Sequence, residues 1–322
     1  MITTLACTMP LAHGLAGEDA EKPTLNLPGP TLGGKQFWAD VELFQDWRIQ
    51  RNSMTGHHRL LDRHDFRHSW GTLPECRQRL QEIKQSKNLP AMRGEAVIIL
   101  HGMLRTRASA EGFAEYLRQK GGYTVFCVGY PTTQADIGEH AQCLANIIEH
   151  LDGIERINLV AYSLGNLVIR HYLADQAAQE GQSADPRIRR IVMLAPPNHG
   201  TPLANPFAHS KIFSALMGPS ARQIANWPES LELQLATPNR EFGIIAGGSG
   251  GKIGFNPLLP GDNDGVIPVE SARLEGAKDF IVLPVVHTMM IHDRDVMACT
   301  LEFFQRGQFP PTDAKPAAPP TD

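Results

Sequence analysis

The chain has 322 residues, of which 42% are hydrophobic and 20% charged, so it is large enough to bury one sizeable core. A formal net charge of -4 argues against a nucleic-acid-binding protein, which needs a clustered basic face. The five cysteines are odd in number and lack metal-ligand spacing, so we expect buried thiols rather than a disulfide framework. No stretch is long and apolar enough to form a transmembrane helix.

The two ends of the chain differ in composition from the rest. Residues 1–34 begin mildly apolar and continue rich in Pro, Gly and charge, which predicts a disordered leader or the remnant of a secretory signal. Residues 308–322 are rich in proline and are expected to form a disordered tail. Localisation stays open between the cytoplasm and a secreted or periplasmic site, because the first residues lack the basic region of a signal peptide.

Residues 35–90 are expected to form a hairpin and a helix that pack on the core. Residues 47–51 and 57–61 flank a Ser-Met-Thr-Gly turn, which is typical of two antiparallel strands. Thr72 and Glu75 then provide a capping box, the start signal of a helix. The apolar residues that share one face of this helix are Cys76, Leu80 and Ile83.

Residues 48–79 are unusually rich in arginine and histidine. We expect them to form a solvated surface with salt bridges. Contact with an anionic membrane is the alternative.

Residues 91–307 are expected to form a single α/β domain. Short apolar runs alternate there with helical patterns, which predicts a mainly parallel, twisted sheet with helices on both faces. The predicted strands cover residues 96–100, 123–129, 156–161, 189–195, 241–247 and 279–286.

The first of these strands ends abruptly in His101-Gly102-Met103-Leu104. A loop at this position can direct a backbone N–H at a negatively charged oxygen. We expect the His101 ring to fix the loop by hydrogen bonding rather than to act as a base.

The third strand leads into Ala161-Tyr162-Ser163-Leu164-Gly165, and a helical pattern follows. A serine on a strand-to-helix turn is presented as a nucleophile, and the residues two before and two after it must be small. Ala161 and Gly165 are both small. The alternative is an ordinary helix-capping serine.

Two further segments supply a candidate acid and a candidate base. Asp264, the candidate acid, lies in Gly261-Asp262-Asn263-Asp264-Gly265, after the fifth strand. The alternatives for this segment are a plain turn and a calcium-binding loop. Asp262 is the competing candidate for the acid. His287 follows the last strand, and we prefer it to His292, which is expected to lie in or at the cap of the final helix.

These segments resemble the motifs of the α/β-hydrolase superfamily, and in particular those of bacterial triacylglycerol lipases and esterases. Pro196-Pro197-Asn198-His199-Gly200-Thr201-Pro202 is similar to a segment of lipid-processing members. The resemblance implies an α/β-hydrolase fold with a small helical lid or cap insertion at about residues 200–238. The apolar residues expected to form one face of this insertion are Phe207, Ile212, Phe213, Leu216, Met217, Ile224, Trp227, Leu231, Leu233 and Leu235.

The resemblance also implies the chemistry. Ser163 is expected to be the nucleophile, His287 the base and Asp264 the acid of a catalytic triad. The backbone N–H groups of Met103 and Leu164 are expected to form the oxyanion hole.

The sequence therefore predicts a serine carboxylic-ester hydrolase that acts through an acyl-enzyme on a small-molecule or lipid ester, with transient contact to a lipid interface. No metal or organic cofactor is expected, since the chain contains no H-E-x-x-H, no paired C-x-x-C and no intact phosphate-binding loop.

A thioesterase or acyltransferase is the alternative enzyme, because the triad does not fix the leaving group. A non-catalytic binding protein of the same fold is the remaining alternative. Acyl-chain length and oligomeric state are not specified by these patterns.

Overall fold

The computed structural model describes residues 28–31, 35–178, 184–201, 211–227 and 229–311. Most of the predicted leader and most of the predicted tail lie outside these residues. None of the described helices is long and apolar enough to cross a bilayer.

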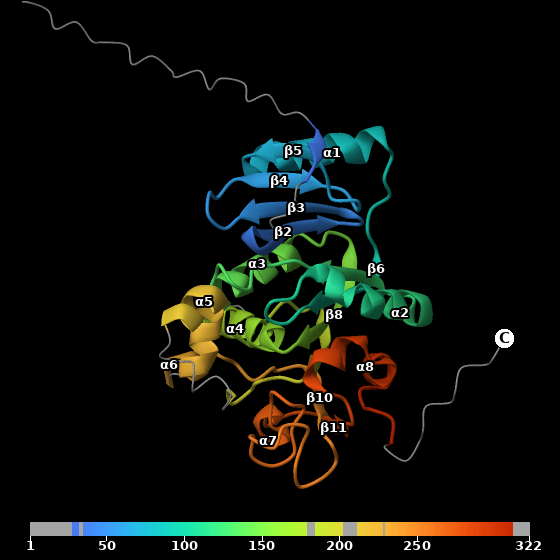
Figure 1. The fold of residues 1–322 in the computed structure, drawn as a ribbon. Helices are drawn as coiled ribbons and strands as arrows, with labels where there is room; N and C mark the ends of the chain where they lie inside the picture. Colours follow the sequence, from blue (N-terminus) through green and yellow to red (C-terminus); the bar gives the residue numbers. More distant parts are fainter. Residues whose placement is uncertain (1–27, 32–34, 179–183, 202–210, 228, 312–322) are drawn as a thin grey trace, which may run out of the picture.

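A parallel sheet forms the centre of the molecule, in the strand order β11-β10-β9-β8-β6-β7 (Figure 1). Every pairing between its described strands is parallel, and the six predicted strands are all present. The strands are β6 (Gly94–Leu100), β7 (Thr124–Val128), β8 (Ile154–Tyr162), β9 (Ile188–Leu194), β10 (Glu241–Gly247) and β11 (Asp279–Leu283). Because Leu100 pairs with Ala161 and Tyr162 with Leu194, three of these strands end side by side at one edge.

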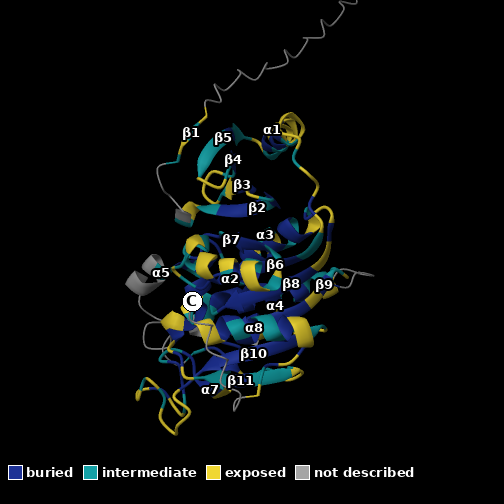
Figure 2. Ribbon diagram, turned by 90° about the vertical axis from the view of Figure 1, so that its right-hand side faces the viewer, coloured by how far each residue is buried: buried dark blue, intermediate teal, exposed yellow. Residues whose placement is uncertain are grey.

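Helices cover both faces of this sheet because its strands bury side chains on both sides. On β8, Leu159 and Ala161 belong to the core under α3 (Ile137–Glu149) and α4 (Leu164–Ala178). Val160 and Tyr162 belong to a second core under α2 (Glu111–Gly121) and α8 (Arg294–Arg306). The central strands are accordingly buried along most of their length (Figure 2). This arrangement is the α/β-hydrolase fold that the sequence predicted.

Further helical segments lie in the connections. They are η1 (Lys35–Phe37), η2 (Arg107–Ala110), α5 (Lys211–Asn226), α6 (Glu229–Leu233), α7 (Val269–Ala272) and η4 (His287–His292). Helix α5 is broken by non-helical backbone at Gly218, before Pro219.

A second, antiparallel sheet precedes the parallel one, in the order β1-β5-β4-β3-β2. Its strands are β1 (Gly29–Pro30), β2 (Trp38–Phe44), β3 (Trp47–Asn52), β4 (His58–Leu61) and β5 (Phe66–Gly71). The predicted hairpin is present as β3 and β4, but it is the middle of a larger sheet that the sequence pattern did not predict.

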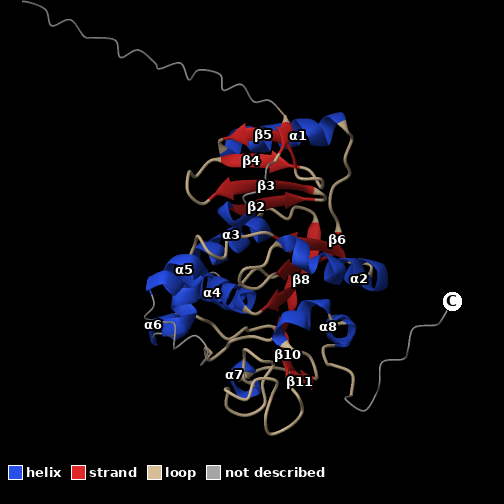
Figure 3. Ribbon diagram, in the orientation of Figure 1, coloured by secondary structure: helices blue, strands red, loops and turns tan. Residues whose placement is uncertain are grey.

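Helix α1 (Leu73–Ser86) lies across one side of the antiparallel sheet, and strand β2 faces the parallel domain (Figure 3). The predicted capping box is present, since Thr72 and Glu75 bond each other's backbone N–H groups. On the opposite side, the N–H of Asp40 donates to Gly129 O at 2.8 Å, and the N–H of Gly129 donates to Asp40 Oδ2 at 2.6 Å. The two sheets are therefore joined at the residue that follows β7.

The arginine-rich stretch is only partly the solvated surface that its composition predicts. Arg79 is exposed and bonds to Glu82, as expected. Arg48 and Arg59, however, are only 5% and 8% exposed. The expectation was wrong for these two residues because their side of the sheet faces the parallel domain instead of water.

The cysteines in the described residues behave as predicted. Cys76, Cys127 and Cys299 are buried free thiols, and Cys143 is half-buried. Burial raises the pKa of Cys76 to about 11, so its thiol stays protonated and unreactive at neutral pH.

Candidate active site

Ser163 lies on the sharp turn between β8 and α4. It has φ = 52°, a left-handed conformation that costs a non-glycine residue roughly 1–3 kcal/mol. Its N–H donates to Leu194 O at 3.0 Å, which ties the turn to the neighbouring strand. A Cβ at Gly165 would lie 3.0 Å from Leu100 O, so this position must be small, as the sequence suggested. This turn is the strand-to-helix elbow predicted for a nucleophile.

His287 and Asp264 meet Ser163 at the same edge of the sheet. Nε2 of His287 lies 3.1 Å from Oγ of Ser163, and Nδ1 of His287 lies 2.6 Å from Oδ2 of Asp264. The backbone N–H of His287 also donates to Asp264 O at 2.8 Å. His287 begins η4, four residues beyond the end of β11, and the predicted last strand was three residues too long. His292 is exposed at the far end of η4.

The Asp264 carboxylate is buried and fixed by backbone donors. Its Oδ1 accepts from the N–H groups of Val266 and Ile267 at 2.9 and 2.7 Å, which leaves Oδ2 for His287. Asp262 points elsewhere, since its carboxylate accepts from the N–H groups of Ser249 and Gly250. The segment is thus a turn, as one alternative held, and it also presents Asp264 to the histidine. Among the described residues no group of three or more His, Cys, Asp or Glu has an arrangement suited to a metal ion.

Two residues that the sequence analysis did not single out hold this site together. The side-chain amide of Asn166 donates to Ser163 O at 3.0 Å and to Leu194 O at 3.1 Å. The Tyr162 hydroxyl donates to His287 O at 2.8 Å. No sequence spacing indicates either residue. Tyr162 bonds backbone that is distant in sequence, and Asn166 bonds backbone at the sharp turn and on a neighbouring strand.

The loop after β6 lies directly beside Ser163. A Cβ at Gly102 would lie 2.8 Å from the Tyr162 ring and 3.2 Å from Ser163 Cβ, so only glycine allows this approach. Leu104 has φ = 58°, and its N–H donates to Thr132 Oγ1 at 3.1 Å. The N–H groups of Met103 and Leu164 donate to no acceptor within the part of the chain that the structure describes. Both groups are therefore available to a ligand.

Replacing Met103 by alanine is expected to keep most of the activity. The predicted oxyanion contact uses the backbone N–H, which alanine retains, so kcat should change by less than about tenfold. The measurement is kcat for p-nitrophenyl butyrate. A complete loss of kcat in a folded Met103→Ala variant would argue against a backbone role.

A largely apolar cavity of about 600 Å³ opens above Ser163. The residues that line it include Met103, Leu104, Ser163, Met217, Ile224 and His287. Met217 and Ile224 come from α5, so the predicted insertion contributes to the cavity wall.

The other residues predicted for the apolar face of the insertion differ in how far they are buried. Leu231 and Leu235 are buried in the core, Trp227 packs partly buried against it, and Leu233 is 87% exposed. Phe207 and the side chains of Ile212, Phe213 and Leu216 lie outside the described residues.

His101 is buried behind this loop and is not part of the serine–histidine contact. Its Nδ1 lies 2.9 Å from Gly102 O, and its ring stacks on Tyr130 at 4.3 Å between centroids. Burial lowers the pKa of His101 to about 4, so the ring is neutral at pH 7. The ring bonds to the loop, as expected. His140 also packs against the Tyr130 ring, and burial lowers its pKa to about 3.

These two histidines predict a specific loss of stability in acid. Below pH 6.5 the unfolded chain protonates both rings, whereas the folded chain keeps them neutral down to about pH 4 and pH 3. The free energy of unfolding should therefore fall as pH falls through this range, by about 1.4 kcal/mol per pH unit for each histidine. Urea unfolding at pH 7, 6 and 5 measures this dependence. His140→Leu should flatten it, whereas His199→Leu, at an exposed position, should not; equal slopes for wild type and His140→Leu would contradict the prediction.

A protein-family model described as "Domain of unknown function (DUF7379)" matches residues 60–235. The chain belongs to this family. The matched segment runs from β4 to the residues after α6 and contains the Ser163 elbow, whereas Asp264 and His287 lie beyond it. A search among curated proteins found no match.

Several solved structures are similar to this DUF7379 protein. The mature form of the lipase BlEst2 from Bacillus licheniformis is 19% identical and has a TM-score of 0.49; the alignment covers 67% of this chain and 94% of that one. The lin2722 gene product from Listeria innocua is 16% identical with a TM-score of 0.45, covering 69% and 99%. An esterase from Thermogutta terrifontis is 14% identical with a TM-score of 0.43, covering 67% and 91%. The strand order and the elbow of this chain are by themselves those of an α/β-hydrolase fold.

Proposed function

We propose that this chain is a serine carboxylic-ester hydrolase that works through an acyl-enzyme. The observation that carries the proposal is the hydrogen-bonded series from Asp264 Oδ2 through the His287 ring to Ser163 Oγ, with the serine at a strained elbow. A serine, a base and a buried carboxylate in this order are the parts that nucleophilic acyl transfer needs.

In the first half of the proposed reaction, Ser163 Oγ attacks the ester carbonyl carbon while His287 Nε2 accepts the hydroxyl proton. Asp264 holds the ring with its proton on Nδ1 and stabilises the imidazolium that forms. His287 then gives the proton to the leaving alcohol as the C–O bond breaks. In the second half, His287 Nε2 takes a proton from water as the water oxygen attacks the acyl carbon, and gives it to Ser163 Oγ as the bond to the acyl group breaks and the carboxylic acid leaves.

The negative charge of each tetrahedral intermediate requires donors. We assign this role to the backbone N–H groups of Met103 and Leu164, which flank the serine and have no acceptor among the described residues. Fixed donors at such a position typically contribute about 3–4 kcal/mol each to transition-state stabilisation.

The cavity favours an ester with an apolar acyl group. Its wall near the serine is formed by Met103, Leu104, Met217 and Ile224, and burial of each additional CH₂ there contributes about 0.8 kcal/mol. Leu104 is also an exposed large hydrophobic residue at the cavity, which favours transient contact with a lipid interface.

Hydrolysis of p-nitrophenyl esters from two to sixteen carbons tests the proposal, together with labelling by a fluorophosphonate and mapping of the labelled peptide. We expect hydrolysis, with an optimum beyond acetate, and a label on the peptide that contains Ser163. Labelling without ester hydrolysis would move the assignment to a thioesterase or acyltransferase, which acyl-CoA substrates then test. No labelling and no hydrolysis would favour a binding protein.

A further inference from the structure

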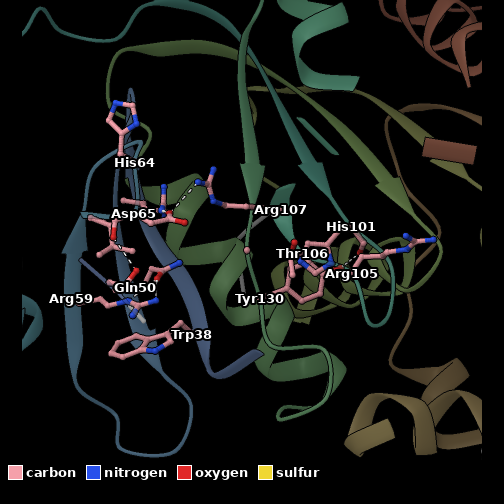
Figure 4. A pocket seen from close by; sticks show the side chains of 14 residues that line it. Trp38, Gln50, Arg59, His64, Asp65, His101, Arg105, Thr106, Arg107 and Tyr130 are labelled. Atoms are coloured by element: carbon pink, nitrogen blue, oxygen red, sulfur yellow. Dashed lines mark hydrogen bonds and ion pairs between the residues drawn. The ribbon is translucent and has the colours of Figure 1, made fainter. Parts of the chain in front are cut away.

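A second cavity, of about 310 Å³, lies between the antiparallel sheet and the parallel domain. Figure 4 shows Gln50 and Arg59 of the antiparallel sheet on one side and His101 and Tyr130 of the parallel domain on the other. Arg107 reaches across to Asp65 at 3.3 Å. The cavity is therefore a junction between the two sheets.

The lining of this cavity is strongly basic. It contains four arginines, Arg48, Arg59, Arg105 and Arg107, and a single carboxylate, Asp65. The charged groups that act on these arginines from just outside the lining are Arg67, Asp40 and Asp62. With these included, arginines still outnumber carboxylates by five to three.

Two of the arginines are buried, and among the described residues neither has a carboxylate to itself, since Asp65 pairs with both Arg48 and Arg107. Arg59 donates from Nε and Nη2 to a single neutral acceptor, Oε1 of Gln50, at 2.9 and 2.7 Å. Arg48 forms an ion pair with Asp65, but its Nε is buried and has no hydrogen-bond partner within the described residues. A buried donor without an acceptor, as at Arg48 Nε, is costly, and so is a buried charge bonded to a neutral acceptor, as at Arg59, so both residues favour a ligand that supplies anionic oxygen acceptors.

The arginines also repel one another. Burial and the neighbouring Arg48 lower the pKa of Arg59 to about 10, and burial and Arg107 lower the pKa of Arg48. An anion bound between Arg48 and Arg59 would offset their mutual repulsion and would raise the pKa of each. The planar guanidinium fork matches the paired oxygens of phosphate and carboxylate.

We propose that this cavity binds a phosphate-type dianion, either inorganic phosphate or the phosphate group of a small monoester, through Arg48, Arg59 and Arg107. A phosphate monoester carries close to two negative charges at pH 7, which matches the local excess of two arginines, whereas a monocarboxylate carries one. The cavity volume leaves room for a small organic group beside the phosphate.

The proposed anion would lie on the other side of the loop that approaches Ser163. Arg105 lines both cavities, and its guanidinium lies 3.4 Å from Thr288 O, next to His287. An anion bound to Arg107 would thus join the antiparallel sheet to the segment that carries Met103. The binding itself does not depend on the proposed ester hydrolysis.

Isothermal titration calorimetry with inorganic phosphate tests the proposal on the full chain at constant ionic strength, with phenyl phosphate and malonate as further ligands. Arg107→Gln is the main variant, because its side chain is 28% exposed and the fold should tolerate its loss. Arg59→Lys keeps the charge but removes the fork. Arg51→Gln, at an exposed position of β3, is the matched control.

We expect one saturable phosphate site in wild type and in Arg51→Gln, with binding weakened about tenfold or more in Arg107→Gln and in Arg59→Lys. Thermal unfolding in chloride buffer confirms that each variant is folded. The proposal is overturned if wild type shows no saturable binding of phosphate or phenyl phosphate, or if Arg107→Gln binds as tightly as Arg51→Gln. Tighter binding of malonate than of either phosphate ligand would overturn the phosphate assignment.

Discussion

Replacing Ser163 by alanine is expected to lower kcat for p-nitrophenyl ester hydrolysis by at least about a thousandfold. The substitution removes the oxygen that His287 Nε2 faces at 3.1 Å and leaves the apolar cavity and the Met103 N–H in place. Substrate binding should therefore persist while covalent chemistry is lost. The measurement is kcat and KM for the best ester of the chain-length series, with fluorophosphonate labelling of the same samples.

The matched control is Ser109→Ala, which removes a hydroxyl that, among the described residues, bonds only the nearby Thr106 O. It should retain kcat and labelling. Alanine at position 163 must keep the same left-handed backbone, so the fold is expected to survive, as thermal unfolding can verify. Labelling of Ser163→Ala at wild-type rate would place the nucleophile elsewhere.

The parallel sheet and the elbow were predictable because their determinants are local. The second half of β8, residues 159–162, is a continuous apolar run since both of its faces are buried there, and α4 follows after a single residue. The small residue at 165 is required by the approach of Leu100 from a different strand, but the requirement is visible locally as a glycine two positions after the serine. Such features leave a pattern in a short stretch of sequence.

The antiparallel sheet was not predictable in the same way. Strand β5 carries Arg67, His68 and Ser69 in succession, so its composition resembles an exposed loop. What makes it a strand is pairing with β4 and cover from α1. The burial of Arg59 likewise depends on Gln50 and on the parallel domain beyond it, neither of which local periodicity indicates.

The hydrogen bonds that brace the candidate site were only partly predictable from the sequence. The elbow places Asn166 in the first turn of α4, but only the fold reveals that its amide reaches Leu194 O on β9. The choice between Asp262 and Asp264 also depends on tertiary structure, because the two carboxylates are two residues apart in one turn. Only Asp264 has its Oδ2 directed at the histidine.

Replacing Asp264 by asparagine is therefore expected to lower kcat by about 10³–10⁴-fold, while Asp262→Asn should keep activity of the wild-type order. Asparagine can still accept the Val266 and Ile267 N–H groups through Oδ1, so the turn should be preserved. Its NH₂ group would then face His287 Nδ1 and favour the tautomer with the proton on Nε2. That tautomer cannot take the proton of Ser163.

The Asp262 variant makes this comparison decisive. The Asp262 carboxylate holds the Ser249 and Gly250 N–H groups of the strand-exit loop, so its replacement should lower the free energy of unfolding rather than kcat. Measuring kcat and urea unfolding for both variants separates the two roles. If Asp262→Asn lost more activity than Asp264→Asn, the carboxylate that supports the base would have to be reassigned. If both variants were fully active, His287 would act without a carboxylate partner, and the hydrogen bond of 2.6 Å to Asp264 would serve the fold alone.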